Sequence, residues 1–158
     1  MKLEINEKLY NCTDAMEMYL DVNESYPLGM KVIYKPIVYI FDWYSFIVCR
    51  KDSKEAESIE NPIVFPDITP LEVQKAYVKS LNSRKLNNIF NRLSDEEYSK
   101  VFWEYFDDGW QNLGDYNMFE RKYRLNRIAE WCEENYIPYY FNKKDDFIKR
   151  TLDYKINH

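Results

Sequence analysis

Aromatic side chains dominate a chain that is almost without glycine. Fifteen tyrosines, nine phenylalanines and four tryptophans make up 18% of its 158 residues, against three glycines and one histidine. Aromatic rings bury large areas in protein cores, whereas glycine-rich loops bind phosphate and histidine moves protons near neutral pH. The histidine is the last residue, His158, and the glycines are scattered. The sequence therefore predicts a rigid, packed domain without the usual catalytic residues.

Length, composition and charge narrow the class of protein. A chain of 158 residues suits one domain, so we expect residues 1–158 to form a single unit. A hydrophobic content of 46% excludes a disordered chain. The net charge of −5 argues against binding to phosphate backbones, which requires a basic face. We expect no direct contact with nucleic acid, and a protein partner or self-association instead.

The cysteines and the N-terminal residues indicate the compartment. Cys12, Cys49 and Cys132 are far apart and form no C-x-x-C pair, so we interpret them as reduced core thiols rather than zinc ligands or disulfides. The first residues lack the apolar stretch of a signal peptide. The longest apolar run, Ile37–Phe41, is too short to span a bilayer. We expect a cytoplasmic protein with no membrane contact and no cofactor.

The first fifty residues predict a helix followed by strands. Apolar residues at helical spacing predict that the first helix continues to Leu20; they are Leu9, Cys12, Met16, Tyr19 and Leu20. A turn is expected over 26–29. Three runs rich in β-branched and aromatic residues then predict a small antiparallel sheet of about three strands, over Met30–Tyr34, Ile37–Phe41 and Tyr44–Cys49.

Helices dominate the second half. Thr69 as N-cap, Pro70 at the first helical position and Glu72 as the partner of a capping box begin one helix. A short helix over 84–93 follows, and Ser94 with Glu97 forms a second capping box. The apolar stripe of the helix after Ser94 is Tyr98, Val101, Phe102, Tyr105 and Phe106.

A long helix over 116–134, capped by Asp115, is expected next. Its apolar residues form two stripes, Leu125, Ile128, Ala129 and Cys132 on one side and Tyr116, Phe119 and Tyr123 nearly opposite. A helix that is apolar on two sides is usually enclosed, so we expect it to be central. Residues 136–141 predict an edge strand because Pro138 interrupts it, and residues 145–154 a short terminal helix.

These elements together predict an α+β fold. An N-terminal helix and a small antiparallel sheet pack against a C-terminal group of four or five helices. Within the single domain, residues 1–50 form the helix and sheet, 51–68 a loop, 69–141 the helical part and 142–158 a C-terminal extension.

Several short motifs resemble a bacterial family of uncharacterised proteins, the family numbered zero-one-five-eight. They are Asp14-Ala15-Met16-Glu17, the stretch from Phe102 to Asp107, Tyr116 with Phe119, and the ending Trp131-Cys132-Glu133-Glu134-Asn135-Tyr136-Ile137. The resemblance covers residues 9–140 and implies an α+β fold with no established activity. Here Tyr136 replaces the glycine of the ending, and Trp103 and Glu104 replace basic residues that are usual in the family.

Three carboxylates form the first candidate site. Glu104 and Asp108 are one helical turn apart and share a face, and Asp107 lies beside them. Carboxylates in this arrangement suit a hard cation such as Mg²⁺. Acidic residues in the last turn also oppose the helix dipole, which a cationic ligand would relieve. The alternative interpretation is a solvated helix end with Gly109 after the last turn.

A cationic strip with nearby aromatic residues forms the second candidate. Arg121, Arg124 and Arg127 follow one another along the long helix, where intrahelical acidic partners account for part of the pattern. We predict an interaction surface composed of Trp103, Trp110, Arg121, Arg124 and Arg127. Acidic residues outnumber basic ones over 94–134, which argues against nucleic acid as its partner.

The leading functional hypothesis is a non-enzymatic interaction or regulatory module that uses an acidic, aromatic-rich helical surface. A metal-assisted hydrolase or transferase built on Glu104, Asp107 and Asp108 is the alternative. A second alternative is an acidic inhibitor that mimics nucleic acid and binds a basic protein.

Overall fold

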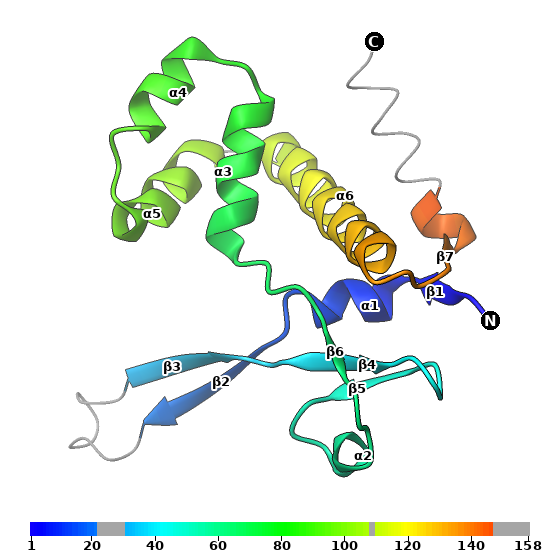
Figure 1. The fold of residues 1–158 in the computed structure, drawn as a ribbon. Coiled ribbons are helices and arrows are strands. Elements are labelled where there is room, and N and C mark those ends of the chain that lie inside the picture. The colour runs from blue at the N-terminus through cyan, green and yellow to red at the C-terminus, as the bar shows by residue number, and fades with distance from the viewer. Residues whose placement is uncertain (22–30, 108–109, 147–158) are drawn as a thin grey trace.

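The computed structural model describes residues 1–21, 31–107 and 110–146, with the side chains of 18–21, 31–34 and 110–113 excepted. The fold is α+β, as predicted (Figure 1). Its strands are β1 (Leu3–Ile5), β2 (Met16–Asp21), β3 (Lys31–Pro36), β4 (Tyr39–Asp42), β5 (Ile47–Arg50), β6 (Ile63–Val64) and β7 (Tyr139–Phe141). Its helices are α1 (Glu7–Cys12), α2 (Lys54–Glu57), α3 (Pro70–Ser80), α4 (Arg84–Phe90), α5 (Asp95–Phe106) and α6 (Trp110–Glu134).

The strands form three small sheets where a single one was predicted. β2 pairs with β3 in an antiparallel hairpin, and β4 pairs with β5 and β6 in an antiparallel sheet of order β5-β4-β6. β1 and β7, from opposite ends of the chain, pair in parallel. Strands therefore occur within the three predicted runs, but β5 begins at Ile47 and not at Tyr44, and β3 belongs to a different sheet from β4 and β5.

The prediction that the first helix continues to Leu20 is wrong. Helix α1 ends at Cys12, and Thr13 closes it by donating its hydroxyl to the carbonyl of Tyr10. The stretch from Met16 to Asp21 alternates apolar and mostly polar residues, which also fits a strand, and pairing with β3 makes it β2. The predicted turn over 26–29 lies outside the described residues.

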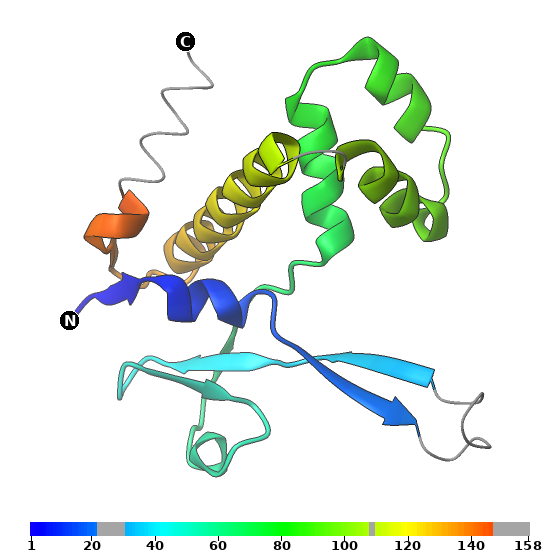
Figure 2. The same cartoon turned by 180° about the vertical axis from the view of Figure 1, so that it is seen from behind.

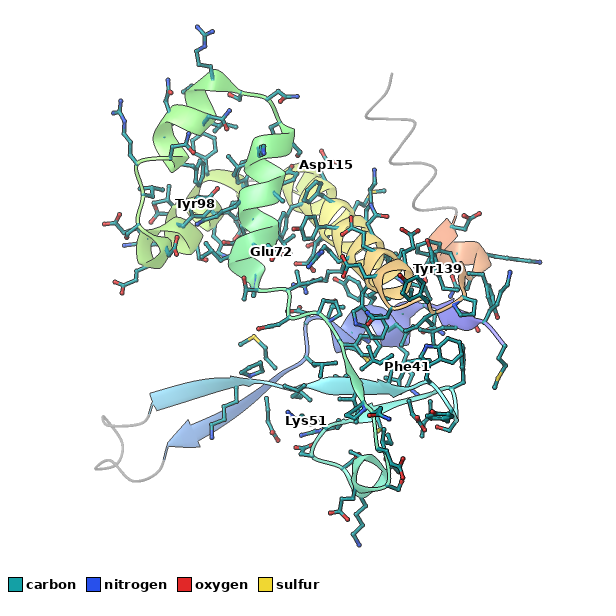
Figure 3. All side chains as sticks on the ribbon, in the orientation of Figure 1. Phe41, Lys51, Glu72, Tyr98, Asp115 and Tyr139 are labelled. Atoms are coloured by element: carbon teal, nitrogen blue, oxygen red, sulfur yellow. The ribbon has the colours of Figure 1, made fainter. Side chains whose placement is uncertain are left out.

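Helices α3 and α5 begin where their caps predict. The Thr69 hydroxyl accepts the backbone N–H of Glu72, and Ser94 and Glu97 form a complete capping box. Glu72 instead accepts a 2.9 Å hydrogen bond from the hydroxyl of Tyr123 on α6 (Figure 3). The predicted loop over 51–68 contains α2 and β6.

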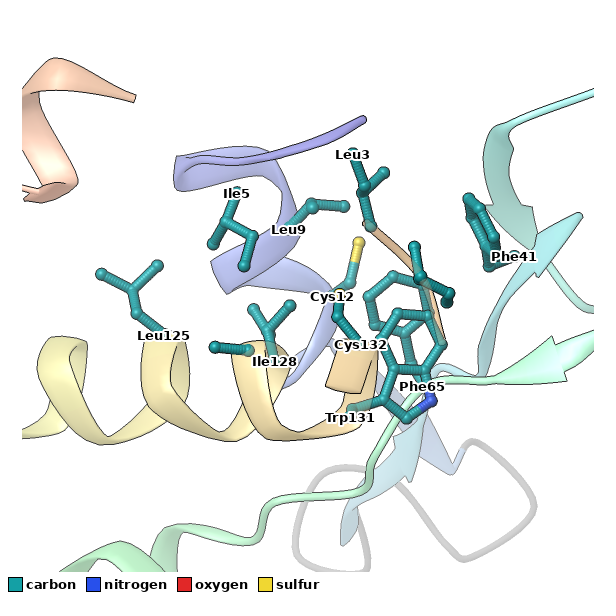
Figure 4. Packing of buried hydrophobic residues seen from close by; sticks show 12 residues of the cluster. Leu3, Ile5, Leu9, Cys12, Phe41, Phe65, Leu125, Ile128, Trp131 and Cys132 are labelled. Atoms are coloured by element: carbon teal, nitrogen blue, oxygen red, sulfur yellow. The ribbon is translucent and has the colours of Figure 1, made fainter. Parts of the chain in front are cut away.

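Helix α6 is central, as its two stripes predict. It begins at Trp110, so Asp115 lies within the helix and is not its cap (Figure 3). One cluster of buried residues joins Leu125, Ile128 and Cys132 to α1, β1 and the strand sheet (Figure 4). The other joins Tyr116 to the buried rings of α3, α4 and α5. The helix thus holds the two parts of the core together.

A Schellman motif ends α6. The backbone N–H of Ile137 donates to the carbonyl of Cys132 at 2.8 Å, and that of Tyr136 to the carbonyl of Glu133. Tyr136 has a φ of 56°, in the left-handed region that favours glycine. The chain then enters β7, and the predicted terminal helix is described only as far as Asp146.

The elements form two groups on either side of α1. In Figures 1 and 2 the helices α3 to α6 lie on one side, and the strands β2 to β6 on the other. The hairpin of β2 and β3 projects beyond the rest of the described chain in both views. The segment from Phe65 to Thr69 crosses from the sheet to the helices, passing the end of α1.

Candidate functional site

The predicted carboxylate site is not assembled among the described residues. Glu104 and Asp107 are exposed at the end of α5, and the backbone N–H of Asp107 donates to the carbonyl of Trp103 as part of the helix end. Asp108 lies outside the described residues. In the part of the chain that the structure describes, no three histidine, cysteine or acidic side chains are placed to hold a metal ion together.

The predicted interaction surface is divided by the fold. Arg121 is mostly buried and pairs with the buried Asp145, whose Oδ1 lies 3.0 Å from its Nε. Arg124 is fully buried, so it is no part of a surface. Arg127 is partly exposed and pairs with Glu130 at 3.0 Å. The three arginines therefore occupy three different environments.

The two tryptophans predicted for that surface lie at either side of the α5–α6 connection. Trp103 is 38% exposed and packs edge-on against Phe102 and Tyr116. Trp110 is the first residue of α6, and its side chain is not described. Neither is placed against the arginines by a described contact.

A different candidate site lies where three connecting segments meet. A cleft of about 260 Å³ lies between the end of α1, the link from β3 to β4, and the segment from β6 to α3. We call it the linker cleft. Its lining residues are Cys12, Thr13, Asp14, Ala15, Met16, Pro36, Ile37, Val38, Tyr39, Val64, Phe65, Pro66, Asp67, Ile68, Thr69 and Pro70.

Exposed apolar side chains surround the linker cleft. Met16, Val38 and Val64 are 44%, 39% and 49% exposed, although each is of a type that is usually buried. They come from three segments that are distant in sequence, so the fold has gathered them. Together with the apolar lining of the cleft they form a surface to which a partner could bind.

The apolar character continues along the hairpin. Met16 and Pro36 are paired in the register of β2 and β3, and both line the cleft. The pairs at the next alternate positions, Met18 with Tyr34 and Leu20 with Val32, are also apolar. The intervening pairs are Glu17–Lys35, Tyr19–Ile33 and Asp21–Lys31, of which the first and the last carry opposite charges. The register therefore brings the pair Met16 and Pro36, at the base of the hairpin, into the lining of the cleft.

The buried Arg124 connects two walls of the linker cleft to α6. Its Nη1 donates to the carbonyl of Thr13 at 2.9 Å and to that of Ile68 at 3.1 Å. Its Nη2 lies 3.2 Å from Oδ1 of Asp14 without the alignment of a hydrogen bond. A guanidinium can serve several acceptors at once because its donors are fixed in a planar fork. Arg124 therefore sets the separation of the two walls.

A polar network on the same face of α6 supports this arrangement. The hydroxyl of Tyr10 donates to Oε1 of Glu120 at 2.6 Å, and Tyr116 donates to the other oxygen at 3.4 Å. Burial and the neighbouring Glu120 raise the pKa of both tyrosines well above the ordinary value. Both hydroxyls therefore stay protonated and act as donors at neutral pH.

Two carboxylates give the linker cleft a negative character. Asp14 and Asp67 are exposed in its lining, which contains no lysine, arginine or histidine. Partial burial raises the pKa of Asp14, an effect that Arg124 opposes and Glu120 reinforces. Asp67 has neither an ion pair nor a side-chain hydrogen bond within residues 1–21, 31–107 and 110–146. An apolar site with carboxylates at its edge suits an apolar ligand that also carries a positive charge.

Sequence reasoning missed the linker cleft because its walls meet only in the folded chain. One signal was present: Arg124 lies between the two apolar stripes of its helix, which is where a buried cation would be expected. Prolines at 36, 66 and 70 also mark the segments that form the walls.

The chain matches no family model, no curated protein and no solved structure. The resemblance stated from its motifs consequently remains a prediction. Among the described helices, none is both long and apolar enough to cross a membrane.

Proposed function

We propose that this protein is a non-enzymatic interaction module, and that the linker cleft binds an apolar segment of a partner protein. The observation that carries the proposal is the apolar cleft ringed by the exposed side chains of Met16, Val38 and Val64. Water contact at these residues is unfavourable, and a partner that covers them gains roughly 25 cal/mol for each Å² of apolar surface buried.

The surrounding structure favours an extended segment as the ligand. The cleft is lined by strand ends and links rather than by helix faces, and the first pair of the hairpin, Met16 with Pro36, lies in its lining. An extended peptide presents alternate side chains to a surface of this kind. A partner segment with apolar residues would therefore meet both the cleft and the base of the hairpin.

The helical surface that the sequence suggested is less suited to this role. Most described rings of α5 and α6 pack in the core, including the buried Phe102, Phe106 and Tyr116. Trp103 and Tyr105 are the exposed large rings of α5, at 38% and 37%. Neither of them lines the linker cleft.

The two alternative functions receive less support. The metal-assisted reaction lacks a described cluster of ligands around Glu104 and Asp107. The mimic of nucleic acid needs an uninterrupted acidic surface. Asp95 instead pairs with Lys75 at 2.7 Å, and Glu130 pairs with Arg127. A cytoplasmic location is part of the proposal, because the three cysteines are buried free thiols.

Display of random octapeptides on phage tests the proposal. We expect the wild-type protein to enrich peptides with neighbouring apolar residues, and Val64→Glu to lose that enrichment because it places a charge at the edge of the cleft. Ile47→Glu is the matched control, since Ile47 is 42% exposed on the same sheet and does not line the cleft. Equal enrichment by wild type and Val64→Glu would contradict the proposal.

A further inference from the structure

From the charges of the linker cleft we infer the chemistry of its partner: an extended segment in which apolar residues are followed by a lysine or arginine. This inference rests on the proposed function and adds the positive charge. The apolar residues would occupy the cleft, and the basic side chain would lie between the carboxylates of Asp14 and Asp67.

Charge complementarity carries the inference. Both carboxylates are exposed in the lining, which holds no cationic side chain. Asp14 is already next to Arg124, whose guanidinium is fully buried and cannot move out to meet a ligand. Asp67 has no described ion-pair partner. A ligand cation would therefore find a free carboxylate at Asp67, whereas a ligand anion would be repelled by it.

The neighbouring surface fixes the side on which the base binds. A second hollow shares Pro36, Ile37 and Val38 with the linker cleft and lies across that link. Its lining carries the cationic side chains of Lys35, Arg50 and Lys51 against the carboxylates of Glu17 and Asp52. This excess of positive charge disfavours a ligand cation, so the basic residue is expected at the Asp14 and Asp67 side.

Three synthetic probes separate the apolar and the charged contributions. Each is a capped hexapeptide of glycine in which two central leucines are followed directly by lysine, glutamine or glutamate. Exposed ion pairs are weak, so we expect the lysine probe to bind wild type roughly three to five times more tightly than the glutamine probe. The glutamate probe should bind more weakly than the glutamine probe.

Charge variants assign the preference to the cleft. Asp67→Asn should reduce the advantage of the lysine probe to about twofold or less, because one carboxylate is removed from an exposed position. Glu96→Gln removes the same charge on the exposed surface of α5 and should retain the full advantage. Circular dichroism confirms that both variants are folded.

The outcomes distinguish this inference from the proposed function. Equal affinity of the three probes would contradict the inference that the partner carries a basic residue, but it would still support an apolar binding site. Probes that bind nowhere, or a neutral glutamine probe that binds Val64→Glu as tightly as wild type, overturn the proposed function itself. Two further results would replace the partner protein as occupant: tighter probe binding when residues 147–158 are removed, or a dimer in sedimentation that Val64→Glu dissociates. Preference for lysine that depends on Asp67 supports the inference.

Discussion

Arg124 lies with its Nη2 3.2 Å from the carboxylate of Asp14, joining the middle of α6 to the segment that follows α1. The arginine is fully buried, and the side chain of aspartate is 38% exposed. The pair therefore spans from the core to the linker cleft. Because the same guanidinium holds the carbonyls of Thr13 and Ile68, the position of the cleft walls depends on one side chain.

Arg124→Met tests this dependence. The variant leaves two carbonyls without their donor and Asp14 without its neighbour, so we expect it to lower the free energy of unfolding by about 2–4 kcal/mol. Arg127→Met is the control on the same helix, where loss of an exposed pair should cost about 0.5 kcal/mol or less. Urea denaturation measures both, and similar losses would contradict the assigned role of Arg124.

The aromatic core provides a second comparison, between two residues that are adjacent in sequence but differ in burial. Phe102 is fully buried and contacts the rings of Tyr77, Phe90 and Tyr116, whereas Trp103 is 38% exposed. We expect Phe102→Ala to cost roughly 3–5 kcal/mol, and Trp103→Ala about 1 kcal/mol, although tryptophan is the larger side chain. Thermal unfolding of the two variants measures the order, and a larger loss for Trp103→Ala would show that the core has been misplaced.

Local signals in the sequence predicted the helical half of this fold well. Caps at Thr69 and Ser94 and the stripes of α6 depend on residues close in sequence; α3 and α5 begin where predicted, whereas α6 begins at Trp110, before the predicted cap at Asp115. The error at Met16 to Leu20 arose because a short apolar run fits both a helix and a strand, and pairing with β3 decided between them. The parallel pairing of β1 with β7 joins opposite ends of the chain, which no local pattern reveals.

The candidate site was less predictable than the fold. The linker cleft is formed by connecting segments, whose residues have no periodicity. Spacing indicated that Arg121, Arg124 and Arg127 share a strip. A step of three residues falls short of a full helical turn, however, so successive side chains point in progressively different directions around the helix. The fold buries Arg124, pairs Arg121 with Asp145 and leaves Arg127 near the surface. Burial of a charged side chain depends on the elements that pack around it. The spacing of residues along a helix does not specify those elements.

The left-handed backbone conformation of the residue after α6 predicts a stabilising variant. Tyr136 has a φ of 56°, and its side chain is 87% exposed, so replacement loses little packing. Non-glycine residues pay about 1 kcal/mol for this conformation. We expect Tyr136→Gly to raise the free energy of unfolding by about 0.5–1 kcal/mol, and Tyr136→Ala to leave it nearly unchanged. Urea midpoints measure both, and a loss of stability in Tyr136→Gly would refute this assignment.

The buried thiols predict a loss of stability at high pH. Burial raises the pKa of Cys12 from 9.0 to about 11 and that of Cys132 from 9.0 to about 12. Unfolded thiols ionise first as the pH rises above 9, so the unfolded state binds fewer protons than the folded state. Stability should therefore fall with rising pH from about 9 to 12, by up to about 1.4 kcal/mol per pH unit for each thiol.

The double variant Cys12→Ala/Cys132→Ala isolates this effect. Its urea midpoint should depend less on pH between 9 and 11 than that of wild type. Alkylation by iodoacetamide at pH 9 gives a second measurement, in which Cys12 and Cys132 react only after unfolding. Rapid alkylation of either thiol in the native protein would contradict their burial.

Mapping the bound lysine probe by amide chemical shifts tests the central claim most directly. In a titration of the ¹⁵N-labelled protein, the account predicts saturable shifts concentrated in residues 12–16, 36–39 and 64–70, the segments that line the linker cleft. Val64→Lys should abolish those shifts, because it places a cation at the edge of the cleft, and Ile47→Lys should retain them. Shifts centred on the exposed rings of Trp103 and Tyr105, with the cleft segments unchanged, would contradict it.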